Sequence, residues 1–168
     1  MDWLTQTDAY IWITGTFAGR TLVTFFVSMI PIVELRGAIP LGVGLGLPPW
    51  YSMLVSIAGN MVPVPFIVLF IRRIFEWMKT KSERLSKWVD KRIEKTMKRR
   101  KVVYHSELLG LILFVAVPLP GTGAWTGGLL AALLNVRLRN AVLCILAGVV
   151  IAAVIITSLT YGFLGIFG

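Results

Sequence analysis

The sequence predicts an all-α integral membrane protein, and three observations support this prediction. Hydrophobic residues make up 57% of the chain, against about 45–50% in a soluble domain, and the mean hydropathy is +0.80. Two long stretches, 50–71 and 140–168, contain no charged residue, and about 20 apolar residues suffice to cross a bilayer. Two further apolar stretches are interrupted by proline and glycine. We therefore expect an inverted repeat, in which each half holds a re-entrant helical hairpin followed by a transmembrane helix.

The first interrupted stretch, Pro31–Pro49, carries Glu34 and Arg36 in apolar surroundings. A charge at the bilayer centre costs at least about 2.5–3.5 kcal/mol on insertion scales, so two charges there need a role. Pro40 cannot continue a helical hydrogen-bond ladder. Irregular backbone at membrane depth persists only where protein or a water-filled cavity satisfies it. We interpret Glu34–Gly46 as a re-entrant loop and its return, which line a substrate site.

Two interpretations are open for residues 10–33, which are apolar apart from Arg20. The segment is long enough to span the membrane. Alternatively, a short interfacial helix to about Gly19 precedes the first arm of the hairpin. The next stretch, Trp50–Ile71, has no charge and is expected to span, with a kink near Pro63 and with Asn60 facing protein.

The basic segment 72–101 contains 13 Lys/Arg and 4 Asp/Glu, which equals the net charge of +9 of the whole chain. Its apolar residues recur at helical intervals, which indicates one amphipathic helix. The positive-inside rule places this helix on the cytoplasmic leaflet, against anionic lipid headgroups, and explains the charge without nucleic-acid binding. A solvated hairpin arm or a coiled-coil partner is the alternative.

The second half repeats the order of the first. An apolar arm leads into the Pro/Gly stretch Val117–Gly128, and 140–168 is the final span. An offset of 89 aligns Pro31 with Pro120, and Ala58–Gly59 with Ala147–Gly148. We expect one membrane domain over 1–168. It consists of repeat one (about 20–71), the basic helix (72–101) and repeat two (about 104–168).

Charge bias also gives an orientation in the cell membrane. With the basic helix cytoplasmic, the first span begins outside, so the first loop opens from outside and the second from the cytoplasm. Broken helices that meet from opposite faces are a layout of many transporters. The protein is then multi-pass, with both termini outside if 10–33 does not span.

The candidate site combines a fixed cation, a titratable acid and backbone donors. Arg36 can hold a phosphate in bidentate fashion, and free N–H groups at a helix start favour anions. Glu34 can take up and release a proton. The alternative is structural: the charged pair ties down the loop, the threonines cap turns, and Arg20 either pairs with Glu34 or extends to the outer surface. The candidate residues are Glu34, Arg36, Arg20, Gly121, Thr122, Gly123, Trp125 and Thr126.

Two motifs carry a family resemblance. Glu34-Leu-Arg-Gly-Ala-Ile-Pro40, followed by Pro118-Leu-Pro-Gly-Thr-Gly-Ala-Trp-Thr-Gly127, resembles the small multidrug export protein family over nearly the whole chain. That family in turn is similar to the DedA superfamily. The second resemblance implies two opposed re-entrant helices and the flipping of polyprenyl phosphates or the scrambling of phospholipids.

These observations favour a membrane transporter for an amphipathic anion, a polyprenyl phosphate or phospholipid, coupled to protons through Glu34. A first alternative is a small-molecule exporter, with an aromatic cavity around Trp125. A second is a non-transporting scaffold that binds anionic lipid or a partner protein. With one Cys and one His, and with no paired-carboxylate or Ser-His-Asp pattern, the sequence favours neither an enzyme nor a metal site, and we expect no cofactor. A chain of this size has few helices with which to enclose a cavity, so packing alone favours a homodimer.

Overall fold

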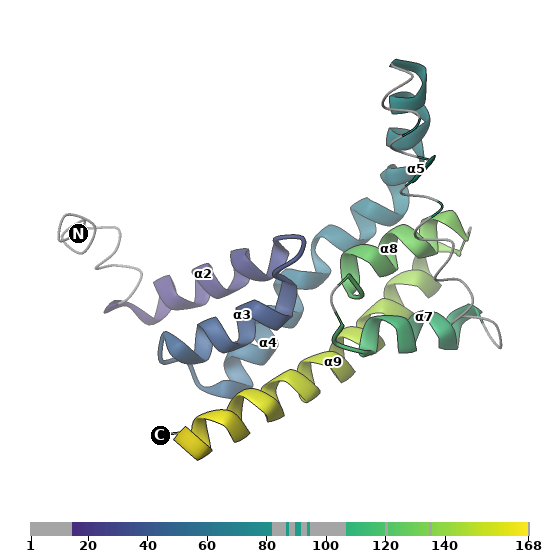
Figure 1. The fold of residues 1–168 in the computed structure, drawn as a ribbon. Helices are drawn as coiled ribbons and strands as arrows, with labels where there is room; N and C mark the ends of the chain where they lie inside the picture. The colour runs from purple at the N-terminus through teal and green to yellow at the C-terminus, as the bar shows by residue number, and fades with distance from the viewer. Residues whose placement is uncertain are drawn as a thin grey trace. The chain divides into compact units, whose positions relative to one another are not determined.

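The computed structural model describes residues 15–81, 87, 90–91, 94, 107–119, 121–134 and 136–167. Within these residues the regular structure is entirely helical, which confirms the all-α class (Figure 1). The helices are α2 (Phe17–Met29), α3 (Glu34–Gly44), α4 (Pro49–Met61), α5 (Pro63–Lys81), α7 (Glu107–Ala116), α8 (Ala124–Leu133) and α9 (Leu138–Phe167).

The chain forms two compact units, whose boundaries fall within the spans and not between the predicted repeats. Unit 1 comprises Met1–Asn60 and Ala153–Gly168, and unit 2 comprises Met61–Ala152. Each unit contains one pair of short helices joined by a turn, α2–α3 in unit 1 and α7–α8 in unit 2. The order of two short helices followed by a longer apolar segment therefore occurs twice along the chain.

Among the described residues, two segments are long and apolar enough to cross a bilayer, Pro49–Ile71 and Leu138–Gly162. They coincide with the two predicted spans. The first is broken at Val62, because α4 ends there and Pro63 starts α5. Proline is favoured at the first position of a helix, where its missing N–H costs nothing. The kink predicted near Pro63 is thus a break between two helices.

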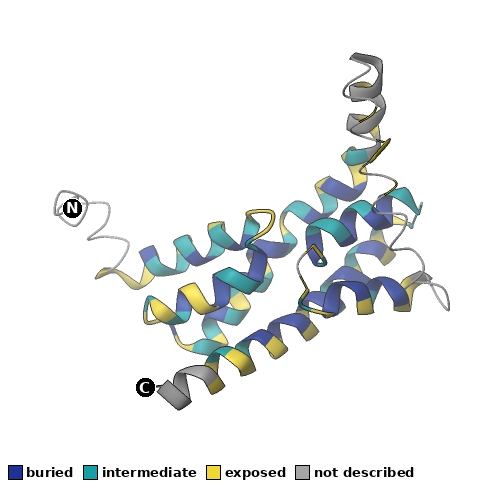
Figure 2. Cartoon of the chain, in the orientation of Figure 1, coloured by how far each residue is buried: buried dark blue, intermediate teal, exposed yellow. Residues whose placement is uncertain are grey.

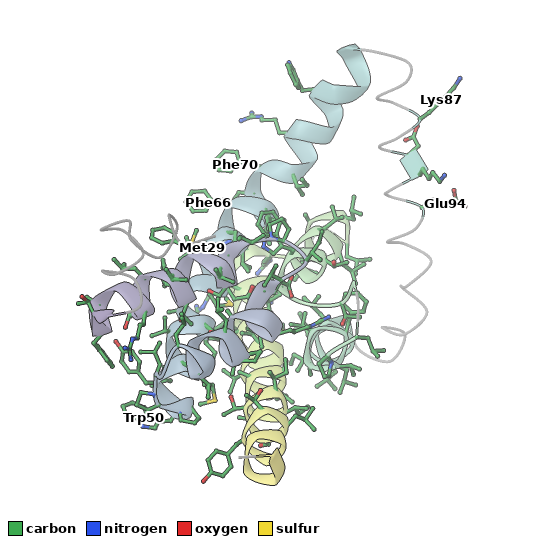
Figure 3. The ribbon with its side chains drawn as sticks, turned by 60° about the vertical axis from the view of Figure 1, so that its left-hand side comes forward. Met29, Trp50, Phe66, Phe70, Lys87 and Glu94 are labelled. Carbon is green, nitrogen blue, oxygen red and sulfur yellow. The ribbon has the colours of Figure 1, made fainter. Side chains whose placement is uncertain are left out.

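Helix α5 continues without interruption to Lys81, so the predicted basic helix begins as an extension of the span and not at residue 72. Most of 82–101 lies outside the described residues. The exceptions are Lys87, Asp90, Lys91 and Glu94, which are helical and exposed. Lys87 precedes Asp90 by three residues and Lys91 by four, and Glu94 follows them by four and by three; Figure 3 labels Lys87 and Glu94. That spacing belongs to one face of a helix, as predicted for the charged face of this segment.

Helices α2 and α3 form a hairpin with a short turn at Ile30–Val33 (Figure 1). Within Glu34–Gly46, which was predicted as a loop and its return, Glu34–Gly44 is therefore one helix, and the irregular backbone expected around Pro40 was wrong. Pro40 lies inside this helix and is exposed. A proline removes one backbone donor, but the same helix buries three apolar side chains, and this packing outweighs the loss. These side chains are Leu35, Ala38 and Ile39.

Helix α4 runs parallel to α2 and antiparallel to α3. At the start of both parallel helices, the ring centroids of Phe17 and Tyr51 are 5.0 Å apart. Near their ends, Gly59 packs directly against the carbonyl oxygen of Phe25 and the hydroxyl of Ser28. Met29 at the end of α2 accordingly lies well away from Trp50 at the start of α4 (Figure 3).

Unit 2 is held together by close contacts at glycines. Gly128 of α8 lies against Ile67 of α5, where a Cβ at 128 would stand 3.1 Å from the nearest side-chain carbon. Gly148 of α9 lies against α7, where an added Cβ would stand 2.8 Å from the carbonyl oxygen of Ile112. Small residues are what allow helix backbones to approach closely where lipid surrounds a protein.

The outer faces of the spans are apolar. Along α9, buried and exposed residues lie on opposite sides of the helix (Figure 2), and the exposed side carries large aliphatic residues such as Leu143 and Val154. On α5, Phe66 and Phe70 project from one side and are 60% and 47% exposed (Figure 3). Such surfaces suit contact with lipid chains.

Candidate functional site

A column of polar side chains runs through the interior of unit 1. Ser52, Ser56 and Asn60 follow one another at four-residue spacing on α4, so they share one helix face. Thr24 and Ser28 have the same spacing on α2. All five side chains are completely buried. Polar groups removed from water need hydrogen-bond partners.

Three of these five side chains have partners. Thr24 donates to the carbonyl of Arg20 at 2.8 Å, and Ser28 donates to the carbonyl of Phe25 at 2.6 Å, both within α2. The Ser52 hydroxyl instead reaches across to α3 and donates to the carbonyl of Ile39 at 3.0 Å. This bond ties the return helix of the hairpin to the span.

Ser56 and Asn60 differ from these three side chains. The hydroxyl of Ser56 and both polar atoms of the Asn60 amide are buried without a hydrogen-bond partner among the described residues. The hydroxyl of Thr157, on the part of α9 that belongs to unit 1, is likewise buried without a hydrogen-bond partner among the described residues. A buried donor or acceptor without a partner costs about 1–3 kcal/mol. The sequence prediction that Asn60 faces protein is confirmed.

Glu34 is the first residue of α3 and is only 5% exposed. Its backbone N–H donates to the carbonyl of Ile30 at 3.0 Å, which closes the hairpin turn. A carboxylate in the first turn of a helix is stabilised by the helix dipole. The backbone here is unusual, because Glu34 has φ +48° and Ile32 has φ +89°. A positive φ is costly for a β-branched residue, and such strain is often stored at functional sites.

Arg36 is half-buried and interacts electrostatically with Glu34. The structure therefore brings together the two charges that the sequence singled out. Arg20 lies near Gly46, just beyond the end of α3. A Cβ added at Gly46 would stand 2.9 Å from the guanidinium Nη1 of Arg20. Glu34 begins α3 and lies about 15 Å away along that helix, at 1.5 Å per residue. Arg20 and Glu34 thus occupy opposite ends of the hairpin and do not pair.

The five candidates of the second loop gather in unit 2, around the start of α8. Gly121 has φ +81°, and Gly123 is the N-cap of α8 with φ +133°. The Thr122 hydroxyl lies 2.6 Å from the carbonyl oxygen of Val117 and accepts from the N–H of Leu119 at 3.2 Å. Thr122 therefore stabilises the turn, as its structural alternative predicts.

Trp125 and Thr126 follow in the first turn of α8, and both are partly exposed. They are available for contacts that a buried residue cannot make. Their lining of one cavity together with Glu34 stays a prediction, because the two loops belong to different units. Among the described residues, no group of three or more His, Cys, Asp or Glu side chains could hold a metal ion.

Comparison with known families identifies the relationship. Residues 34–155 match the sequence model of a family described as "Putative small multi-drug export protein". The chain belongs to this family. The small multi-drug export match begins at Glu34 itself and ends within α9, so it includes every candidate residue except Arg20. No curated protein and no solved structure matches the chain. The comparisons thus give no link to the DedA superfamily.

Sequence reasoning missed the polar column of α2 and α4. The signal was present, because Ser52, Ser56 and Asn60 recur every four residues within a stretch that is otherwise apolar. Small polar residues with that period commonly mark a helix–helix contact in membranes. The prediction concentrated on charged residues and considered Asn60 alone.

Proposed function

We propose that this protein exports small amphipathic molecules across the cell membrane, with a proton moving in the opposite direction through Glu34. One observation carries the proposal: in a member of the small multi-drug export family, a carboxylate is buried at the start of α3, at the hairpin turn. Ionisable residues at membrane depth commonly mark proton or substrate pathways. In this proposal Glu34 binds a proton and releases it once in each transport cycle.

An anionic lipid headgroup, the substrate first predicted from Arg36, fits less well. The most deeply buried charge is negative, and the guanidinium of Arg36 already faces the opposite charge of Glu34. A phosphate would have to compete with that carboxylate. A neutral or cationic amphipathic molecule would not have to compete with the carboxylate. The partly exposed indole of Trp125 can bind a cation through its ring face.

The lengths of the hairpin helices support the re-entrant interpretation. Helix α2 has 13 residues, α3 has 11 and α8 has 10. At 1.5 Å per residue these helices are about 15–20 Å long, against about 30 Å of hydrocarbon. Aliphatic side chains are exposed at both turns: Ile32 is 95% exposed and Leu119 is 57% exposed. Such turns are suited to the apolar middle of the bilayer.

The orientation of the hairpins in the membrane follows from charge bias. We place the basic segment 72–101 in the cytoplasm by the positive-inside rule, so α4 begins at the outer face. Because α2 and α4 are parallel, the hairpin α2–α3 then opens from outside and Glu34 lies at its inner end. The second hairpin opens from the cytoplasm, which gives an inverted repeat with alternating access.

Proteoliposomes loaded with ethidium, a cationic amphipathic dye, test the proposal. We expect a proton gradient to drive ethidium movement by the wild type, and we expect Glu34→Gln to slow this movement at least tenfold. Trp125→Ala should also reduce it, whereas Leu143→Ala, on the lipid-facing side of α9, serves as the control.

Three results would contradict the proposal. Gradient-driven dye movement that persists in Glu34→Gln would remove the proton role. Transbilayer movement of a fluorescent polyprenyl phosphate that is lost in Arg36→Ala, without any dye movement, would instead favour the anionic lipid. Loss of cellular phenotype on neutralising 72–101, with both hairpins insensitive to mutation, would favour the scaffold.

A further inference from the structure

We infer a second site in unit 1: Ser52, Ser56 and Asn60 of α4 hold bound water that conducts protons from the start of α4 to Glu34. The inference rests on the proposed function in one respect, the role of Glu34 as proton acceptor. The site itself rests on independent observations: these side chains are buried, and Ser56 and Asn60 have no hydrogen-bond partner in the part of the chain that the structure describes.

The chemistry of the Asn60 amide indicates what the ligand must be. Its Oδ1 accepts and its Nδ2 donates, and both are buried without a partner. A metal cation would satisfy the oxygen and leave the N–H₂ group unpaired. Water both donates and accepts, and buried water in proteins typically makes about three hydrogen bonds to groups of this kind. Water therefore satisfies all three atoms at Ser56 and Asn60.

The spacing of the column also fits water. Residues four apart on a helix are displaced by about 6 Å along its axis, at 1.5 Å per residue. One water that bridges two polar groups spans about 4.5 Å, because its two hydrogen bonds are each about 2.8 Å long and meet near the tetrahedral angle, and two waters in sequence span about 7 Å. One or two waters between Ser52 and Ser56, and again between Ser56 and Asn60, would thus give a continuous hydrogen-bonded chain.

The two ends of the column lie where a proton route needs them. Asn60 follows Gly59, which packs against the Ser28 end of α2, and this is the end at which the hairpin turns into Glu34. The other end lies next to Trp50, which is 62% exposed at the start of α4. The 11 residue steps from Pro49 to Asn60 cover about 16 Å, which is half of a hydrocarbon core of about 30 Å.

The charges around the column favour protons over other ions. Within the described part of unit 1, the charged side chains are Arg20, Glu34 and Arg36, on α2 and α3. Helix α4 has none, and the described part of α9 in this unit has none. Helix α4 thus offers no carboxylate that could replace the hydration shell of another cation. A proton instead moves by exchange of hydrogen bonds: each water gives a proton forward and receives one from behind, and the last water gives its proton to the Glu34 carboxylate.

The water is tested directly by solid-state NMR on the ¹⁵N-asparagine-labelled protein in lipid bilayers. We expect magnetisation to pass from water to the side-chain amide of Asn60, even though that side chain is completely buried. The Asn60→Leu variant assigns the signal. An Asn60 amide that receives no magnetisation from water would overturn the site, whatever the protein transports.

The proton route is tested by separating two modes of transport. We expect Ser56→Ala and Asn60→Leu to slow proton-driven ethidium movement at least tenfold, while ethidium exchange without a gradient stays near the wild-type rate. Thr24→Val is the matched control, since its hydroxyl is equally buried but already bonded within α2. Ser56→Ala removes one atom only, so it keeps the test valid if Asn60→Leu fails to fold.

The outcomes distinguish the two proposals. Wild-type rates of proton-driven movement in both variants, with Glu34→Gln inactive, would overturn the water route and leave the exporter intact. Absence of gradient-driven ethidium movement in the wild type would contradict the proposed function, and the proton route with it. In that case the NMR signal of Asn60 still decides whether the column holds water.

Discussion

Units 1 and 2 use the same packing device in different chemical surroundings. In unit 1, Gly59 brings the span against the backbone of α2 at Phe25. In unit 2, Gly148 brings the last span against the backbone of α7 at Ile112. The two glycines are 89 positions apart, the offset that the sequence repeat predicts. Each one packs a span against the first helix of the neighbouring hairpin.

The difference lies in what surrounds these glycines. In unit 1 the contact continues into hydroxyl and amide groups, with Ser28 against Gly59, and it ends near the buried Glu34. In unit 2 the corresponding contacts are apolar: Gly148 lies against Val115, and Gly127 lies against Val115 and Ile145. The two units thus share a way of packing, but among the described residues the buried polar side chains lie in unit 1. This division agrees with a repeat in which one half performs the ionic chemistry and the other supplies matching shape.

The largest expected effect comes from filling the two glycine contacts. A methyl group at 59 would collide with the backbone oxygen of Phe25, and a methyl group at 148 would lie 2.8 Å from that of Ile112. Neither oxygen can move without its helix. We expect Gly59→Ala and Gly148→Ala each to lower the free energy of unfolding by about 3 kcal/mol, the upper end of usual overpacking costs. Unfolding of the purified protein in mixed micelles measures this.

Equal losses at both positions would support equivalent packing in the two units. A large loss at one position and none at the other would contradict it, because the correspondence would then be limited to sequence. The inverted arrangement of the units stays a prediction in either case.

The sequence predicts the positions of the spans and breaks better than the nature of the first loop. The long apolar stretches and Pro63 sufficed for the spans, because these signals are local. The helix Glu34–Gly44 was missed, because Pro40 and the nearby glycines indicate a break when they are considered without their neighbours. Burial of Leu35, Ala38 and Ile39 against the rest of unit 1 decides the conformation, and tertiary packing of this kind often overrides local propensity.

The candidate site was predictable where it depends on charge. Glu34 and Arg36 are anomalous in an apolar stretch and are found interacting. The separation of Arg20 from Glu34 was not predictable, because it depends on the length and direction of α3. The unpartnered state of Asn60 could not be inferred either, since hydrogen-bond partners arise only when helices pack.

A smaller effect tests the polar contact that is specific to unit 1. The Ser52 hydroxyl donates to the Ile39 carbonyl across the α3–α4 contact. Ser52→Ala should lower the free energy of unfolding by about 1 kcal/mol, the usual net value of one such bond. Ala132→Ser, at a buried position of α8 in unit 2, is the complementary change. An Ala132→Ser that is tolerated is expected, since a helical hydroxyl can donate to its own helix as Thr24 does, whereas no loss of stability in Ser52→Ala would contradict the bond between α3 and α4.

The smallest effect separates glycines that the packing requires from those that it does not. Gly42 and Gly44 both lie in α3, but a Cβ at 42 would collide with the Ser52 hydroxyl and crowd Thr24, while nothing lies within 4 Å of a Cβ at 44. An alanine loses less conformational freedom on folding than a glycine does. We therefore expect Gly44→Ala to raise the free energy of unfolding by about 0.5–1 kcal/mol, and Gly42→Ala to lower it. The same unfolding measurement decides between them. A stabilising Gly42→Ala would mean that α3 can move away from α2 and α4, and that the contact between the three helices in unit 1 is looser than the glycine contacts of unit 2.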